Sequence, residues 1–163
     1  MIARSSNFKG APRPYAEAKE LGVIDARIAP LVEAMNQIPI IQTIASCEGH
    51  RDWFFLYLPP YVFFNTTVVM AGAIEKALRS CDEERSGVHL NYYWEVAAKF
   101  DESSDLKYTV TIPAINSRHP IKATRAKVDR DIQIIIGLLS KAYEQLNNHI
   151  PGHDSFLEQK HHD

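Results

Sequence analysis

The stretch TRAKVDRDIQIIIGLLSKAYEQLN, residues 124–147, decides the fold class of this chain. Its apolar side chains recur every three or four positions, which places them on one stripe of an α-helix. The stripe is formed by Val128, Ile132, Ile135, Ile136, Leu139, Tyr143 and Leu146. A helix with one apolar face has to bury that face against another layer. We therefore expect residues 124–147 to form a helix that packs on a β-sheet.

Four segments upstream of this helix are predicted to supply the sheet. Ile40–Ser46 is short, apolar and β-branched, and Tyr61–Asn65 is an aromatic run that follows two prolines. Both patterns are typical of strands. Leu90–Phe100 and Leu106–Ile112 alternate in polarity and are separated by turn-forming residues 101–105, which predicts a β-hairpin.

Two shorter helices complete the pattern, and the first is expected to begin near Pro30. Proline is tolerated in the first turn of a helix, where its missing N–H costs little. Asp25 is placed to cap the start of this helix, and Asn36 and Pro39 are expected to end it.

The second short helix is predicted to run through Val69–Leu78, with Asn65 or Thr66 as its cap. Gly72 inside it suggests close packing on the sheet. The resulting order is α-β-β-α-β-β-α. This order predicts a two-layer α+β domain with a mixed or antiparallel sheet and the helices packed on one face.

The composition fits an ordinary globular domain, because 45% of the 163 residues are hydrophobic and 23% are charged. We expect one domain over residues 21–150, preceded by an arm (1–20) and followed by a flexible tail (151–163). The formal net charge of −2 argues against a non-specific nucleic-acid binder, which needs a basic surplus. A local basic stretch nevertheless runs over residues 118–130.

The expected location is cytoplasmic. No apolar run approaches the roughly 18 residues that a membrane span requires, and the start of the chain lacks the apolar core of a signal peptide. In a reducing compartment, Cys47 and Cys81 are expected to be free thiols. A homo-oligomer formed through the aromatic surface stays open.

The segment Ser46-Cys47-Glu48-Gly49-His50 concentrates reactive side chains where a predicted strand runs out into a loop. Loops on a rigid scaffold are common places for binding and catalysis. We take Cys47, Glu48 and His50 as candidate catalytic residues. Gly49 would permit a positive φ or the close approach of a ligand to the backbone.

Three interpretations of this segment stay open. Cys47 and His50 form a C-x-x-H pair that suits zinc, but a zinc site needs further ligands, and Cys81, His89 and His119 are the candidates. Alternatively, a nearby imidazole activates Cys47 as a nucleophile. In the third interpretation these residues only stabilise the loop.

A nucleotide or another planar ligand would need a wall beside the segment. Trp53 and Tyr57 follow it closely and are candidates to stack on such a ligand. Arg51, together with the basic stretch at residues 118–130, would meet phosphate groups.

The runs GVIDARIAPLVEAMNQIP (residues 22–39) and TIASCEGH (residues 43–50) resemble the opening of the wybutosine-synthesis tRNA methyltransferase family. That family has a helix with I-D-x-x-I-x-P-L-V and N-x-x-P, followed by a strand that ends in T-S-S-C-S-G-R. The later predicted elements occupy the corresponding places, so the resemblance covers about residues 21–147.

The resemblance implies an enzyme that transfers a methyl group from S-adenosylmethionine to a modified guanosine in tRNA. The matching site residues are Ser46, Cys47 and Gly49, with Thr43 just upstream. The departures are Ala45, Glu48 and His50, which replace two serines and an arginine, and the compact residues 51–60, which replace a Gly- and Lys-rich loop.

We therefore expect a small protein of methyltransferase-like fold that binds or modifies a nucleotide or RNA-derived ligand at a strand-end pocket. The residues expected to bind the substrate are Thr43, Ser46, Gly49, Arg51, Trp53 and Tyr57. The resemblance implies S-adenosylmethionine as the cofactor, and no metal is assigned. The alternatives are a non-catalytic accessory protein and a zinc- or Cys-dependent enzyme.

Overall fold

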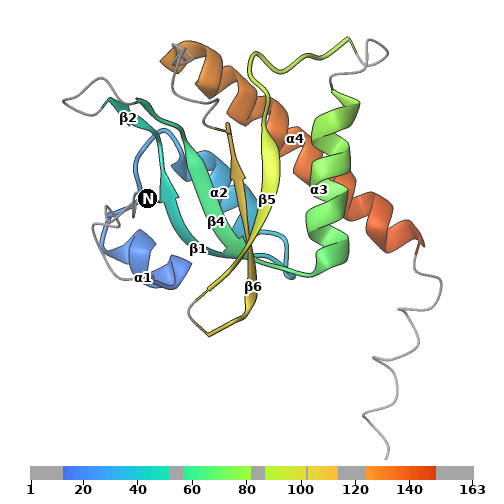
Figure 1. Cartoon of the computed structure of the whole chain (residues 1–163), viewed down its shortest axis with the longest axis horizontal. Helices are drawn as coiled ribbons and strands as arrows, with labels where there is room; N and C mark the ends of the chain where they lie inside the picture. Colours follow the sequence, from blue (N-terminus) through green and yellow to red (C-terminus); the bar gives the residue numbers. More distant parts are fainter. Residues whose placement is uncertain (1–12, 52–56, 82–86, 102, 114–123, 150–163) are drawn as a thin grey trace, which may run out of the picture.

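A four-stranded antiparallel sheet in the order β1-β4-β6-β5 forms one layer of the computed structural model, and helices form the other (Figure 1). The structure describes residues 13–51, 57–81, 87–101, 103–113 and 124–149. The helices are α1 (Tyr15–Glu20), α2 (Ala29–Asn36), α3 (Val68–Ser80) and α4 (Arg125–His149). The strands are β1 (Gln42–Cys47), β2 (His50–Arg51), β3 (Tyr57–Leu58), β4 (Tyr61–Asn65), β5 (Glu95–Phe100) and β6 (Leu106–Thr111).

The predicted α-β-β-α-β-β-α order is confirmed by α2, β1, β4, α3, β5, β6 and α4. The structure adds two elements to it: the small β2–β3 hairpin and helix α1. Residues 15–20 of the predicted N-terminal arm form a helix, which the sequence did not predict. Helix α1 has no buried residue, so the sequence shows no apolar stripe there. An ion pair between Lys19 and Glu33 of α2, at 2.8 Å, joins α1 to the domain.

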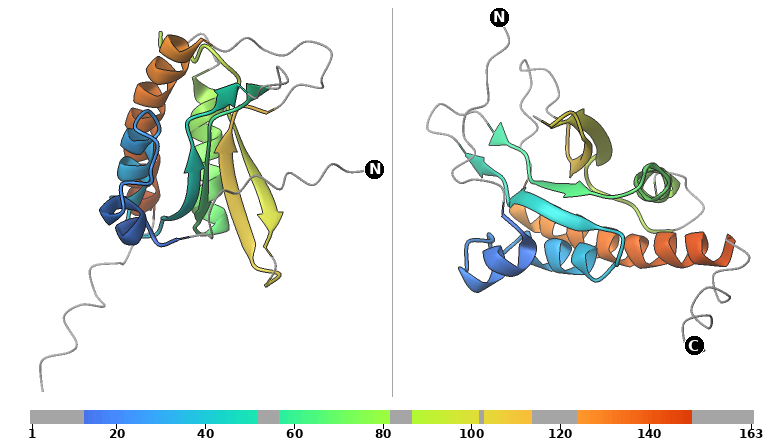
Figure 2. Two further views of the ribbon diagram at one scale, coloured as in Figure 1. Left: turned by 90° about the vertical axis from the view of Figure 1, so that its left-hand side faces the viewer. Right: turned by 90° about the horizontal axis from the view of Figure 1, so that it is seen from below.

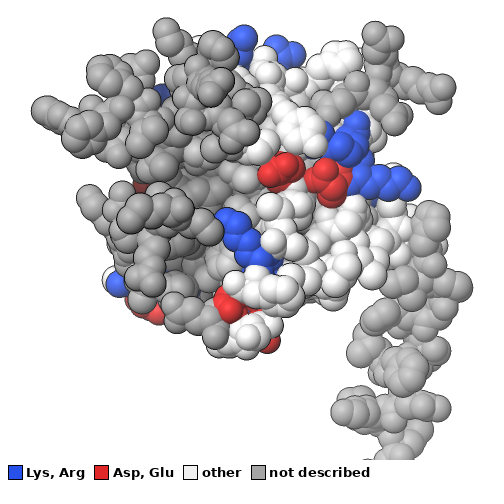
Figure 3. All heavy atoms as spheres, viewed as in Figure 1, with Lys and Arg blue, Asp and Glu red and all other residues white. Residues whose placement is uncertain are grey.

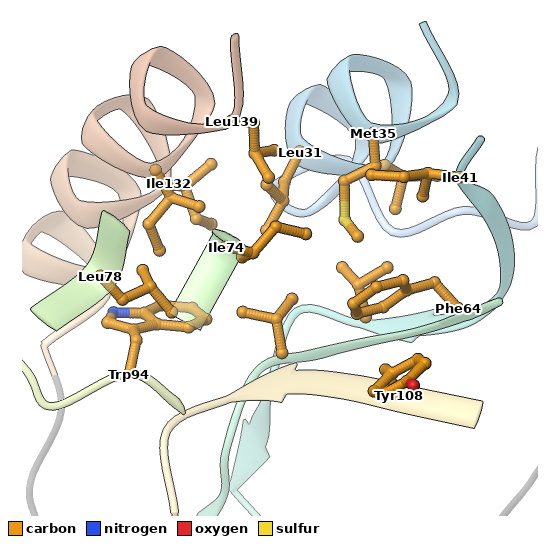
Figure 4. Close-up of a cluster of buried hydrophobic side chains, with 14 of the residues drawn as sticks. Leu31, Met35, Ile41, Phe64, Ile74, Leu78, Trp94, Tyr108, Ile132 and Leu139 are labelled. Carbon is orange, nitrogen blue, oxygen red and sulfur yellow. The ribbon is translucent and has the colours of Figure 1, made fainter. Parts of the chain in front are cut away.

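The helices pack on one face of the sheet (Figure 2). Helix α4 contacts both α2 and α3, and α3 also contacts β5. Figure 4 shows Leu31, Met35, Ile132 and Leu139 of α2 and α4 directed towards the sheet residues Phe64 and Tyr108. This arrangement confirms the expected two-layer α+β fold. The apolar stripe of α4 is buried because it meets two helices as well as the sheet.

Strand register decides which side chains face this core. Val62 pairs with Val110 and Phe64 pairs with Tyr108, and all four side chains are buried. Because side chains alternate along a strand, Tyr61 and Phe63 lie on the opposite, outer face of the sheet.

Strand β5 begins later than expected, at Glu95 and not at Leu90. The reason is a buried carboxylate that accepts hydrogen bonds from the backbone just before the strand. Asp131 of α4 is fully buried and accepts hydrogen bonds from the N–H groups of Asn91 (2.8 Å) and Tyr92 (3.0 Å). It also accepts from the Asn91 side-chain amide (2.8 Å) and from Trp94 Nε1 (3.1 Å). These donors bind a helix side chain and not a neighbouring strand.

Helix α3 differs from expectation in two details. Its cap is Thr67, whose hydroxyl accepts from the Met70 N–H at 3.2 Å, whereas the Thr66 hydroxyl donates to the Ile40 carbonyl at 2.8 Å. Gly72 is exposed, and a Cβ added there would meet no atom within 4 Å. The expected packing of Gly72 on the sheet is therefore wrong.

A search of the described helices for a membrane-spanning candidate, by length and apolar character, finds none.

The Asp131 contacts predict a large loss of stability for Asp131→Asn. The substitution removes the negative charge and places the new amide N–H donors opposite the N–H donors of residues 91–94. Hydrogen bonds to charged groups contribute about 1.5–3 kcal/mol each, so we expect a loss of about 2–4 kcal/mol in the free energy of unfolding, measured by urea denaturation. The matched control is Asp129→Asn on the same helix, whose carboxylate is 43% exposed. It should cost less than about 1 kcal/mol. Equal losses for the two variants would contradict the assigned role of Asp131.

Candidate functional site

Cys47 is the last residue of β1 and lies opposite Tyr61 of β4, on the outer face of the sheet. Both side chains are partly buried. The β1–β4 register contains a bulge between Thr43 and Ala45, so Ile44 has no partner on β4. The thiol and the phenol ring therefore lie side by side where β1 leaves the sheet.

Gly49 follows this strand end with a φ of 85° and is buried. The predicted positive φ is confirmed, and it suits glycine because a Cβ would be strained there. The Gly49 N–H donates to Cys47 Sγ at 3.4 Å. The chain then continues into β2, where His50 pairs with Leu58 and Arg51 pairs with Tyr57. The proposed wall of Trp53 and Tyr57 stays a prediction, since Trp53 lies outside the described residues.

Glu48 is bonded on several sides. Its N–H donates to Asp25 Oδ2 at 3.1 Å, and its own Oε2 accepts from the Arg27 N–H at 3.4 Å. Its Oε1 accepts from the Arg125 guanidinium at 3.2 Å. The Glu48 side chain is only 17% exposed. Glu48 thus joins the end of β1 to the turn before α2 and to the first residue of α4.

Asp25 therefore has a different role from the helix cap that the sequence suggested. Helix α2 has Ile28 at its N-cap and no side-chain cap. The Asp25 carbonyl accepts from the N–H groups of Ile28 (3.2 Å) and Ala29 (3.0 Å), while its carboxylate binds Glu48. Asp25 is a site residue that sequence reasoning placed elsewhere.

A second ion pair, between Arg27 and Asp129 at 2.8 Å, completes a set of charged residues at this end of the sheet. We call this set the strand-end cluster, and it consists of Asp25, Arg27, Glu48, Arg125 and Asp129. Three carboxylates and two guanidinium groups give the cluster a formal charge of −1. The carboxylates therefore outnumber the cations beside Cys47.

Burial and these carboxylates change the acidity of the neighbouring groups. Burial raises the pKa of the Cys47 thiol, and the charges of Asp25 and Glu48 raise it further, although the Gly49 N–H opposes them. Burial likewise raises the pKa of Tyr61, with smaller contributions from Cys47 and Asp25. Cys47 is therefore a protonated thiol at neutral pH, which disfavours the nucleophile interpretation.

Thr43 and Ser46 were both expected to contact a substrate. Thr43 is 4% exposed, and its hydroxyl and N–H bind the Asn36 side chain at 2.6 Å and 3.2 Å. These bonds join the start of β1 to the end of α2, at the other end of the strand from Cys47. Ser46 pairs with Val62, which places it on the helix side of the sheet, next to the strand end.

The arrangement of possible metal ligands gives no support to the zinc interpretation. Among the residues that the structure describes, no three His, Cys, Asp or Glu side chains are grouped to hold a metal. Cys81 is buried at the end of α3, and His89 is exposed. His119 and the His50 side chain lie outside the description.

The raised pKa of Cys47 predicts slow alkylation. Because the thiolate is the reactive form, we expect Cys47 to react with iodoacetamide at pH 8 more slowly than a cysteine in an unstructured peptide, with a rate that keeps rising above pH 9. Peptide mass spectrometry separates Cys47 from Cys81. In Asp25→Asn the reaction should accelerate. Labelling of the unsubstituted protein at the peptide rate would refute the assignment.

The bonds of Glu48 predict that Glu48→Gln destabilises the domain by about 1–2 kcal/mol, because the substitution removes a mostly buried charge with two partners. Guanidinium denaturation gives the free energy. The control is Glu33→Gln, which removes an exposed ion pair with Lys19 and should leave stability unchanged within error. If both variants lose the same amount, Glu48 does not brace the strand end.

Comparison with known proteins leaves the family open. No family model matches the sequence, and no curated protein matches it. Among solved structures, the PH1069 protein from Pyrococcus horikoshii is similar over 82% of this chain and 88% of its own, with 12% identity and a TM-score of 0.39. This likeness is too low to carry an argument about function.

Proposed function

We propose that this chain binds S-adenosylmethionine at the end of β1 and acts on a nucleotide or RNA-derived ligand, as a divergent relative of the wybutosine-synthesis tRNA methyltransferases. The observation that carries the proposal is the joint position of Cys47, Gly49 and Tyr61 beside the Asp25 carboxylate. Cys47 and Gly49 are also residues on which the sequence resemblance rests. The joint position of these residues indicates where the ligand binds, and the charge at that position indicates which ligand it is.

The charge of the strand-end cluster suits this cofactor. The carboxylate of Asp25 raises the pKa of both Cys47 and Tyr61, which means that it produces a negative potential at both side chains. A negative potential attracts the sulfonium cation of S-adenosylmethionine, and a carboxylate accepts hydrogen bonds from ribose hydroxyls. The same potential opposes the phosphates of ATP.

The shape of the strand end also fits. Gly49 has no side chain and a left-handed backbone, so no Cβ separates this buried backbone from a ligand held by Cys47 and Tyr61. Tyr61 offers a ring beside the thiol, and planar bases stack on aromatic side chains. The residues proposed to hold the cofactor are Asp25, Cys47, Gly49 and Tyr61.

The bound cofactor would supply the methyl group, so the chain itself needs no nucleophile. That agrees with a protonated Cys47 and with a Glu48 whose oxygens are already engaged by Arg27 and Arg125. We assign Glu48 to bracing the strand end and Cys47 to contacting the ligand. His50 remains the candidate for proton transfer.

An RNA-derived substrate would approach along the start of α4. Lys127 and Arg130 are exposed there and form no ion pair with any described residue. Figure 3 shows cations and anions interspersed on one face of the molecule, where the described residues form no extended basic surface. Phosphate contacts therefore depend on this end of α4, together with Arg51 and the rest of the 118–130 stretch.

Isothermal titration calorimetry with S-adenosylmethionine, S-adenosylhomocysteine and ATP tests the proposal. We expect S-adenosylmethionine to bind more tightly than the neutral S-adenosylhomocysteine, and ATP to bind weakest. Cys47→Leu, which fills the strand end, should reduce the affinity at least tenfold. Ala98→Leu places the same side chain at an exposed position on the far strand and should leave the affinity unchanged. Absence of saturable binding, or equal losses in both variants, would overturn the proposal.

A further inference from the structure

A separate cavity of about 180 Å³ lies at the start of β1, at the opposite end of the strand from Cys47. It is lined by Arg13, Pro14, Gln42, Thr43, Ile44, Asn65 and Lys107. Five residue steps along a strand separate Gln42 from Cys47, which is roughly 16 Å. The cavity is therefore a different place from the strand-end cluster.

Strand pairing brings most of the polar lining together. Gln42 of β1 lies opposite Asn65 of β4, and Lys107 of β6 comes one residue before Tyr108, the partner of Phe64. These three residues form a row across the sheet, on its outer face. Arg13, just before α1, adds a guanidinium group from outside the sheet.

The donors in this row are largely unused. Lys107 has a side chain that is only 15% exposed, and its ammonium lies 3.7 Å from Asp101 and 3.6 Å from Asp105. Both distances exceed hydrogen-bond length. The Asp101 oxygen that faces Lys107 is Oδ2, whereas its Oδ1 accepts from the N–H groups of Ser103 and Asp105 at 2.9 Å each. Lys107 is thus ion-paired with both carboxylates, but it donates no hydrogen bond of ordinary length to either of them.

Arg13 and Gln42 are more exposed than Lys107, and the other donors of the lining make few contacts. Within the described part of the chain, the side-chain amides of Gln42 and Asn65 make no hydrogen bond, and the nearest ion pair of Arg13 is a long one, 3.9 Å from Glu17. The lining contains two cations and no carboxylate. Pro14 and Ile44 provide a short apolar wall. Converging donors of this kind match the oxygens of a phosphate or carboxylate group.

We propose that this cavity is a binding site for a small molecule that carries an oxyanion group, either a phosphate or a carboxylate, held by Arg13, Lys107, Gln42 and Asn65. Arg13 and Lys107 provide the charge, and the two amides fix the orientation. The volume accommodates one oxyanion group with a short substituent. An oxyanion in the cavity would accept the hydrogen bonds that the Lys107 ammonium does not donate to Asp101 or Asp105.

The probes are inorganic phosphate and succinate, titrated into the full chain at low ionic strength and followed by 15N-edited NMR. We expect saturable shifts of the amide signals of Gln42, Asn65 and Lys107 with at least one probe, and the tighter probe identifies the group. Lys107→Gln should weaken that affinity at least tenfold. Gln42→Glu, which places a carboxylate in the cavity, should abolish it.

The matched control is Lys99→Gln, because Lys99 pairs directly with Lys107 across β5 and β6 but does not line the cavity. It makes the same change in net charge and should alter the affinity less than twofold. Thermal melting of every variant shows whether the fold is retained, and Asn65→Leu repeats the test without a charge change. Failure of both probes to bind, or an equal effect of Lys99→Gln and Lys107→Gln, would overturn the proposal.

Discussion

The buried carboxylate of Asp131 is the constraint on which the arrangement of the layers depends. A charge that is fully removed from water is tolerated only when hydrogen bonds replace its hydration, and here two backbone N–H groups, an amide and an indole do so. All four donors come from residues 91–94, between α3 and β5. Asp131 therefore fixes the chain that leads into β5 against the middle of the helix layer. The Trp94 ring, which fills the core, is oriented by the same carboxylate.

Helix α4, which Asp131 holds in place, also supplies the groups that hold the end of β1. Arg125 and Asp129 lie on the two turns before Asp131, and they bind Glu48 and Arg27. The end of β1 is thus held by groups that belong to the helix layer and not to the sheet. These pairs are partly exposed, so each contributes little stability alone. The main effect of these ion pairs is on geometry, because they keep Gly49 and Cys47 in one arrangement relative to Tyr61.

Most of the fold could be predicted from the sequence because the buried face of a helix or strand gives a periodic pattern of apolar residues. The stripe from Val128 to Leu146 gave α4 nearly to its ends, and Tyr61–Asn65 gave β4 with its observed bounds. Helix α1 shows no such pattern because none of its residues is buried. The start of β5 was placed too early because the alternation over residues 90–94 reflects burial of Trp94 next to a helix, and not strand pairing.

The strand-end cluster could be anticipated from the sequence only in part. The segment Ser46–Gly49 could be singled out because reactive residues follow a strand. Asp25, Arg27 and Tyr61 were missed because only tertiary contacts bring them there. Asp25 satisfies a rule for helix caps in the sequence, and nothing local indicates that its carboxylate turns to Glu48 instead. Thr43 was included because it precedes the motif, yet it lies at the other end of β1.

The bulge at Ile44 has a consequence for how such a site arises and is lost. In a regular strand Thr43, Ala45 and Cys47 would all face the same side, which for Thr43 is the helix side. The extra residue shifts the phase of the strand by one position, so that the thiol is presented outwards while Thr43 keeps its place in the core. A lineage that gained or lost one residue here would change which side chains of β1 face outwards, with the packing nearly intact. Insertions and deletions in β1, more than substitutions, would then separate relatives that share this fold from those that also share this surface.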